Sequence, residues 1–81
     1  MNQVFTTQPK LDGAPVEQTN RTELEKLQEG KPIIVRGNRF PNLRPGMVAT
    51  LEHLYDPTNT VKIQIERYFW RPWCLKMTPV Q

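Results

Sequence analysis

Residues 47–69 alternate between apolar and polar side chains on both sides of the segment Asp56-Pro57-Thr58-Asn59-Thr60. Proline suits the first central position of a type I turn and asparagine tolerates the left-handed conformation, so the segment predicts a hairpin with a three-residue loop. Pairing Asp56 with Thr60 makes one face apolar and the other mostly polar, and a shift of one residue would mix the two faces. The expected pairs on the apolar face are Tyr55 with Val61, His53 with Ile63, Leu51 with Ile65, and Met47 with Phe69.

A short helix is expected before the hairpin. Thr22 and Glu25 have the spacing of a capping box, in which each side chain bonds to the backbone N–H of the other residue. Leu24 and Leu27 share one face of this helix, and Gly30 provides a left-handed stop. Because about two helical turns are unstable alone, the two leucines must pack on the rest of the protein.

Other strand and turn signals flank the hairpin. The β-branched segment Pro32–Arg36 predicts a short strand that ends at the following glycine. A loop over residues 37–46 follows, and Arg44-Pro45-Gly46-Met47 has proline and glycine at the central positions of a type II turn. Pro72 interrupts the strand pattern after the hairpin, and residues 74–77 predict a last short strand.

These elements predict a mainly β fold. Four or five short antiparallel strands with one short N-terminal helix close most economically as a small, partly open barrel of the SH3-like or OB-like kind. The alternative is an α+β arrangement in which the helix covers an antiparallel sheet. Residues 1–19 lack apolar periodicity and predict a flexible N-terminal arm, in which only Val4 and Phe5 are expected to dock. Residues 20–81 are expected to form a single domain.

The composition argues against catalysis and metal binding. The 81 residues include no serine and four isolated glycines, so a serine-nucleophile motif and a Gly-rich phosphate loop are both missing. One cysteine (Cys74) and one histidine (His53) cannot form a four-ligand zinc site. We expect Cys74 to be packed and His53 to lie at the barrel rim, with a cysteine–histidine dyad as the alternative. The sequence therefore predicts a protein that is not an enzyme and that has no cofactor and no metal.

The sequence also predicts a cytoplasmic protein. No apolar run approaches the roughly 20 residues that a membrane-spanning helix needs, and the first residues lack the pattern of a signal peptide. A single cysteine cannot form the disulfide framework of small secreted domains, which favours a reducing compartment.

Charge divides the chain into two unlike parts. Residues 1–30 contain three basic and five acidic residues, a balance of −2, whereas residues 31–81 contain eight basic and three acidic residues, a balance of +5. A basic domain that follows an acidic N-terminal segment indicates an anionic partner. Two oppositely charged surfaces of self-associating copies would have the same pattern, so a homodimer is a second interpretation.

The segment Glu66–Trp73 contains four aromatic residues and two arginines. Strand alternation cannot bury all four rings, so at least one or two are expected to stay partly exposed. Exposed rings stack on nucleobases while arginines bind phosphates, and the same residue types dominate protein-binding hot spots. A structural alternative is that Trp70 and Trp73 plug the open ends of the barrel.

The loop from Asn38 to Arg44 is a second candidate, because Arg39 and Arg44 flank Phe40 there. An exposed Phe40 would extend the aromatic and basic surface, and the alternative is that Phe40 and Leu43 fold inward as a minor core. The predicted binding residues are Arg36, Arg39, Phe40, Arg44, Lys62, Arg67, Tyr68, Trp70, Arg71 and Trp73.

The leading functional hypothesis is a small binding module, a regulatory protein that contacts nucleic acid through this basic and aromatic surface. The alternative is a protein-binding adaptor or inhibitor that uses exposed tryptophan, tyrosine and arginine side chains to engage a partner or a second copy of the chain.

Overall fold

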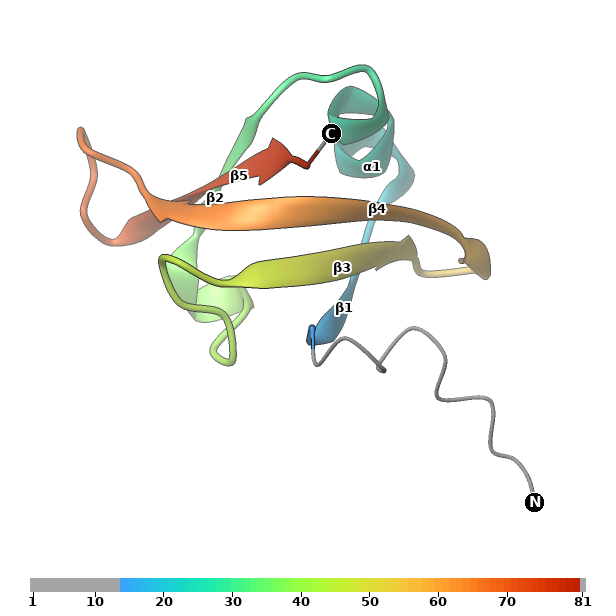
Figure 1. The fold of residues 1–81 in the computed structure, drawn as a ribbon, viewed down its shortest axis with the longest axis horizontal. Coiled ribbons are helices and arrows are strands. Elements are labelled where there is room, and N and C mark those ends of the chain that lie inside the picture. The colour runs from blue at the N-terminus through green and yellow to red at the C-terminus, as the bar shows by residue number, and fades with distance from the viewer. Residues whose placement is uncertain (1–13, 81) are drawn as a thin grey trace.

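Five strands, one α-helix and one 3-10 turn follow one another along residues 14–80, the part of the chain that the computed structural model describes (Figure 1). In chain order they are β1 (Val16–Thr19), α1 (Arg21–Gln28), β2 (Ile33–Arg36), η2 (Gly37–Arg39), β3 (Val48–His53), β4 (Asp56–Arg67) and β5 (Cys74–Pro79). All five strands belong to one sheet with the order β1-β3-β4-β5-β2. Within the described residues no helix is long and apolar enough to cross a membrane.

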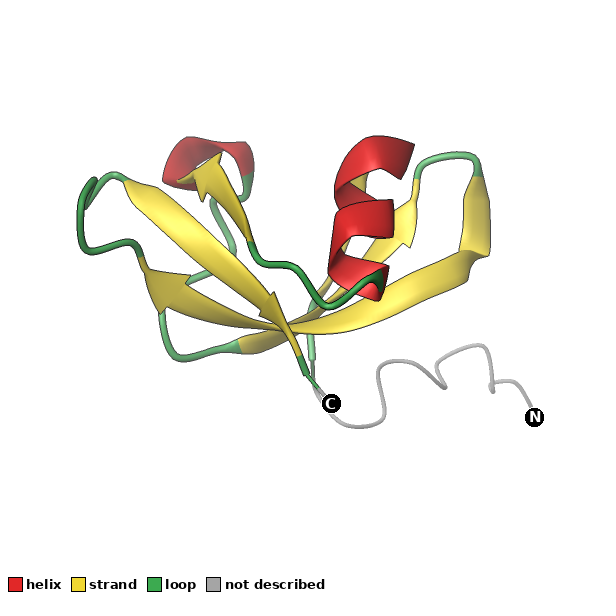
Figure 2. Ribbon diagram, turned by 90° about the horizontal axis from the view of Figure 1, so that it is seen from above, coloured by secondary structure: helices red, strands yellow, loops and turns green. Residues whose placement is uncertain are grey.

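The sheet curls into a half-barrel, and α1 lies on its concave side (Figure 2). The long strand β4 holds the sheet together, because it pairs with both β3 and β5. The edge strands β1 and β2 are joined through α1, which therefore covers the open side of the sheet. The prediction of a mainly β, barrel-like fold with one short helix is confirmed.

The core fills the concave side of the half-barrel. It contains the two leucines of α1, which confirms their predicted packing, and the inward-facing residues of four strands. Two residues of the loop between β2 and β3 complete it. The buried residues of the core are Leu24, Leu27, Ile33, Val35, Phe40, Leu43, Ala49, Leu51, Ile63, Ile65, Leu75 and Met77.

The helix begins with a different cap from the predicted one. The Asn20 side chain accepts a hydrogen bond from the Glu23 backbone N–H at 2.9 Å, so Asn20 and not Thr22 is the N-cap. Asparagine is among the best N-cap residues, and it precedes the first helical residue directly. The predicted stop is confirmed, because Gly30 has a positive φ of 88°.

The hairpin of β3 and β4 turns earlier than predicted. Leu51 lies opposite Val61, whereas the predicted register placed it opposite Ile65. His53 lies opposite Asp56, so the reversal occurs at the two residues between them and not at 57–59. The two registers differ by four residues on β4, an even number, and the apolar and polar faces are therefore the predicted ones.

The segment that was expected to form the hairpin loop is a bulge within β4. Asp56 Oδ1 accepts hydrogen bonds from the Thr58 backbone N–H (3.2 Å) and from the Thr58 hydroxyl (2.6 Å). This local turn inserts three extra residues into β4 between the pairs His53–Asp56 and Glu52–Thr60. Tyr55, in the reversal, and Phe69, beyond the end of β4, lie outside the apolar face, with exposed fractions of 90% and 80%.

The folded domain begins before residue 20. Val16–Thr19 form β1, which pairs with β3 in parallel, so the predicted flexible arm over 1–19 is wrong for these four residues. Their short, polar sequence resembles a loop, and only pairing with β3 makes it a strand. The parallel pair also departs from the predicted all-antiparallel sheet. Val4 and Phe5, the residues expected to dock, lie outside the described residues.

The turn before β3 is the predicted one. The Met47 N–H donates to the Arg44 carbonyl at 3.1 Å, and Gly46 has a positive φ of 96°. A type II turn requires this left-handed conformation, which glycine adopts without strain.

Candidate functional site

The topology brings the arginines of residues 31–81 to one end of the sheet. β2 and β4 end there, and β3 and β5 begin there, so the connecting loops 37–47 and 68–73 lie at the same end (Figure 1). We call this the basic end. Its arginines are Arg36, Arg39, Arg44, Arg67 and Arg71.

The loop between β4 and β5, residues 68–73, presents its rings to solvent, and we call it the aromatic loop. The exposed fractions are 80% for Phe69, 75% for Trp70 and 63% for Trp73, while Tyr68 is half-buried. Phe69 and Trp70 pack edge to face with ring centroids 5.0 Å apart. The exposure predicted for this segment is confirmed, and the alternative in which Trp70 and Trp73 plug the barrel is wrong.

Backbone hydrogen bonds hold the aromatic loop in shape. The Arg71 N–H donates to the Tyr68 carbonyl at 3.2 Å, and the Cys74 N–H donates to the Arg71 carbonyl at 2.8 Å. The Tyr68 N–H donates to the Cys74 carbonyl at 3.3 Å and closes the base of the loop. Two consecutive tight turns therefore hold the backbone of the aromatic loop in place.

Two hollows adjoin Trp73 and share Arg36 as a second lining residue. One, of about 460 Å³, is also lined by Gly37 and Asn38. The other, of about 440 Å³, extends along β2. The residues that line the second hollow are Ile34, Val35, Arg36, Arg71, Trp73 and Cys74.

Cys74 is a packed thiol and not part of a dyad. Its side chain is buried and lines the second hollow beside Arg36, its partner in the β2–β5 register. His53 lies opposite Asp56, at the start of β4, whereas Cys74 lies beside Tyr68, just beyond the last residue of β4. The length of β4 therefore separates the thiol from the imidazole.

Arg39 and Phe40, two of the predicted binding residues, make contacts within the protein. The Arg39 guanidinium donates two hydrogen bonds to the Glu23 carboxylate, at 2.8 and 3.0 Å, and lies 4.9 Å from the centre of the Phe40 ring. The hydrogen bonds from Arg39 lower the pKa of Glu23. Phe40 is only 4% exposed, and Leu43 is buried beside it in the core. The inward alternative for this loop is therefore correct, and exposure of Phe40 is wrong.

The remaining predicted residues separate into two groups. Arg67 ends β4, and Arg44 opens the turn before β3, so both lie at the basic end. Lys62 lies opposite Thr50 in the middle of the β3–β4 pair, away from the aromatic loop. Arg39 pairs with Glu23, whereas the guanidinium groups of the other arginines at the basic end have no carboxylate partner in the part of the chain from 14 to 80. These arginines are Arg36, Arg44, Arg67 and Arg71.

Sequence reasoning missed three residues of this surface. Phe69 was assigned to the apolar face opposite Met47, although the proline three positions later is a signal that the strand pattern ends there. Ile34 lines a hollow because β2 is an edge strand next to β5, and Asn38, in the 3-10 turn that follows β2, lines the other. No pattern within the sequence of β2 indicates which strand will be its neighbour.

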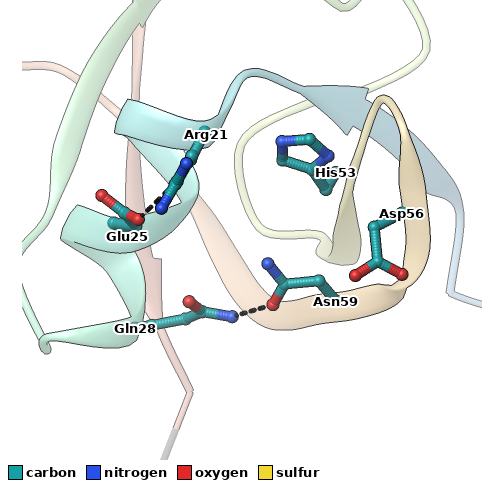
Figure 3. A pocket seen from close by; sticks show the side chains of 6 residues that line it. All are labelled: Arg21, Glu25, Gln28, His53, Asp56 and Asn59. Carbon is teal, nitrogen blue, oxygen red and sulfur yellow. Dashed lines mark hydrogen bonds and ion pairs between the residues drawn. The ribbon is translucent and has the colours of Figure 1, made fainter.

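A third hollow, of about 290 Å³, lies at the opposite end between α1 and the start of β4 (Figure 3). Four of its six lining side chains pair with one another. Arg21 Nε donates to Glu25 at 2.9 Å, and Gln28 Nε2 donates to Asn59 at 2.7 Å. His53 Nδ1 accepts a hydrogen bond from the Tyr55 N–H at 3.0 Å. Tyr55 does not line the hollow, so this bond holds the His53 ring against the turn between β3 and β4.

Residues 14–80 contain no cluster of three or more histidine, cysteine, aspartate or glutamate side chains that could hold a metal ion. Comparison with known proteins finds no matching family model, no matching curated protein and no matching solved structure. The chemistry of the exposed surface is therefore the basis for a functional proposal.

Proposed function

We propose that the protein is a small, non-enzymatic regulatory module that contacts nucleic acid through the aromatic loop and the exposed arginines of the basic end. The observation that carries the proposal is the exposure of Phe69, Trp70 and Trp73 in one hydrogen-bonded loop that also contains Arg71. Several large apolar side chains that are exposed together mark an interaction site.

The two residue types suit the two parts of a nucleotide. A base stacked on an aromatic side chain contributes about 1–3 kcal/mol, without requiring a particular sequence. Guanidinium groups neutralise phosphates and release counterions, which makes such binding salt-dependent. The single free thiol, Cys74, suits the cytoplasm, which we propose as the location.

A protein-binding adaptor is the second candidate, and the edge strand β2 favours it. Ile34 on this strand is 39% exposed, next to the hollow that Trp73 lines. Tryptophan and arginine dominate protein hot spots, and a free strand edge can pair with another chain. A contact of this kind buries apolar area and depends little on salt.

The salt dependence of binding tests the proposal. A fluorescein-labelled oligonucleotide is titrated with the protein at several salt concentrations, and log Kd is plotted against log salt. We expect a steep linear dependence, and the double variant Arg67→Gln/Arg71→Gln should reduce its slope by about one to two.

Arg21→Gln is the matched control, because Arg21 lies in α1 at the opposite end and should leave the slope unchanged. Absence of oligonucleotide binding, or a Kd that does not change with salt concentration, would contradict the proposal. A salt-insensitive, concentration-dependent dimer that Trp73→Ala abolishes would favour the adaptor.

A further inference from the structure

We infer that the nucleic acid is single-stranded and that an unpaired base stacks on Trp73 at the hollows beside the β2 edge. This inference rests on the proposed function and specifies the substrate class of the same surface. Four observations support it: the position of Trp73, the backbone groups of the β2 edge, the flanking arginines and the rigidity of the loop.

Trp73 offers an accessible ring with room beside it. It is 63% exposed and lines both hollows at the basic end. The hollows lie against Gly37 and Asn38 on one side and against Ile34 on the other. A planar base can therefore contact the indole and still reach polar groups around it.

The free edge of β2 supplies hydrogen-bonding groups at this place. The Gly37 N–H donates to the Trp73 carbonyl at 2.9 Å, and this bond shows which residues of β2 bond to β5 and which do not. Backbone groups alternate in direction along an antiparallel strand, so those of Ile34 and Arg36 point away from β5. Each of these two residues has one backbone N–H donor and one carbonyl acceptor, and the Asn38 side-chain amide lies nearby. These groups can form hydrogen bonds with the polar edge of an unpaired base.

Two arginines flank the indole. Arg36 lines both hollows with Trp73, and Arg71 lines the second of them. Neither guanidinium has a carboxylate partner between residues 14 and 80, so both are available to the phosphates on either side of a stacked base. Phe69 and Trp70, in the same loop, provide further rings for a neighbouring base.

The surface is organised before any ligand binds. Hydrogen bonds fix the aromatic loop at both of its turns, and Pro72 restricts the backbone between Arg71 and Trp73. A Cβ atom at Gly37 would lie 3.2 Å from the Trp73 carbonyl, so glycine permits the close approach of β2 to the loop. Preorganisation lowers the entropic cost of binding.

A duplex fits this surface poorly. Its bases are already stacked and paired, and exposing one of them costs a few kcal/mol before any ring can stack on it. A single strand does not have this cost. Stacking on exposed rings therefore favours single strands, whereas arginines alone would favour the denser charge of a duplex.

The test compares a fluorescein-labelled 12-nucleotide oligothymidine with a 12-base-pair duplex at one salt concentration, by fluorescence anisotropy. We expect the single strand to bind at least about tenfold more tightly. Trp73→Ala should weaken single-strand binding about 5- to 150-fold, the range that corresponds to the loss of one stacked base. Tyr55→Ala is the matched control, because Tyr55 is an exposed ring at the opposite end of β4, and it should have no effect.

A second readout reports the contact directly. Trp70→Phe leaves Trp73 as the only tryptophan of the chain, and oligothymidine should quench its fluorescence. Retained near-ultraviolet dichroism and an unchanged urea midpoint would exclude unfolding as the cause of any loss in Trp73→Ala.

The outcomes separate the inference from the proposed function. Equal or tighter binding of the duplex, or undiminished binding by a folded Trp73→Ala, would overturn the inference and leave salt-dependent nucleic-acid binding in place. Absence of binding to both probes would overturn both. Self-association through the β2 edge without oligonucleotide binding would assign the same surface to a protein partner.

Discussion

At the residue scale, aromatic residues in the two loops of the basic end differ in burial, with Phe40 in the core and Trp70 and Trp73 exposed. That some rings of residues 68–73 are exposed was predictable, because strand alternation cannot turn every ring inward, but the exposure of Trp70 and Trp73 in particular was not. The burial of Phe40 was not predictable either, because the loop that carries it has no periodicity and only closure of the half-barrel by α1 provides its partners. Composition alone therefore cannot distinguish a binding ring from a core ring.

Unfolding measurements should separate the two roles. We expect Phe40→Ala to lower the free energy of unfolding by about 3–5 kcal/mol, because it leaves a cavity among buried residues. Trp70→Ala should change it by less than about 0.5 kcal/mol, because the ring is exposed. Urea denaturation followed by circular dichroism measures both, and a large loss from Trp70→Ala would show that this ring belongs to the core.

The ion pair of Glu23 and Arg39 should make stability depend on pH. Hydrogen bonds from Arg39 lower the pKa of Glu23 below its ordinary value of 4.5, so folding favours the ionised carboxylate. The contribution is complete above about pH 4.5 and disappears as the pH falls through the lowered pKa. Glu23→Gln should therefore cost about 1 kcal/mol at about pH 7 and much less at about pH 2.

Glu29→Gln is the control for this measurement, because its pair with Lys31 is exposed. We expect it to change the free energy of unfolding by less than about 0.5 kcal/mol at either pH. A loss from Glu23→Gln that is the same at both pH values would contradict the electrostatic role of the pair.

At the scale of elements, the hairpin shows what periodicity determines and what it leaves open. The alternation of apolar and polar side chains predicted which residues of β3 and β4 face the core. Registers that differ from one another by an even number of residues turn the same side chains toward the core. The alternation could not select among such registers. The choice depends on Asp56, whose side chain stabilises a turn within β4 and leaves Leu54 and Tyr55 to reverse the chain.

Engineered cysteines can test the register. Thr50 and Lys62 face each other. The Ile65 N–H donates to the Met47 carbonyl, and hydrogen-bonded and non-hydrogen-bonded pairs alternate along an antiparallel ladder. Thr50 and Lys62, three positions further along, are therefore a non-hydrogen-bonded pair. Their Cα atoms should be about 4.5 Å apart, within reach of a disulfide. In a Cys74→Ala background, Thr50→Cys with Lys62→Cys should therefore oxidise readily, as mass spectrometry would detect.

The matched pair is Thr50→Cys with Glu66→Cys, the residues that the alternative register would place face to face. In the structure Glu66 lies four residues along β4 from Lys62, about 13 Å away, and should not form a disulfide with residue 50. Efficient oxidation of this second pair, with none of the first, would contradict the observed register.

For the whole molecule, the distribution of charge matters more than its sum. The contrast of −2 and +5 along the chain was visible in the sequence, but the gathering of the later arginines at one end was not. It arises because β2, β3, β4 and β5 all start or finish at that end. Strand β1 was missed for a related reason, since its four residues, three of them polar, become a strand only beside β3.

A chemical-shift titration of the ¹⁵N-labelled full chain with oligothymidine tests the central claim most directly. If the basic end is the nucleic-acid interface, amide shifts should concentrate in residues 34–38 and 67–74, with little change in residues 52–60 around the opposite hollow. Shifts that concentrate in residues 52–60, or no shifts at the basic end, would contradict it.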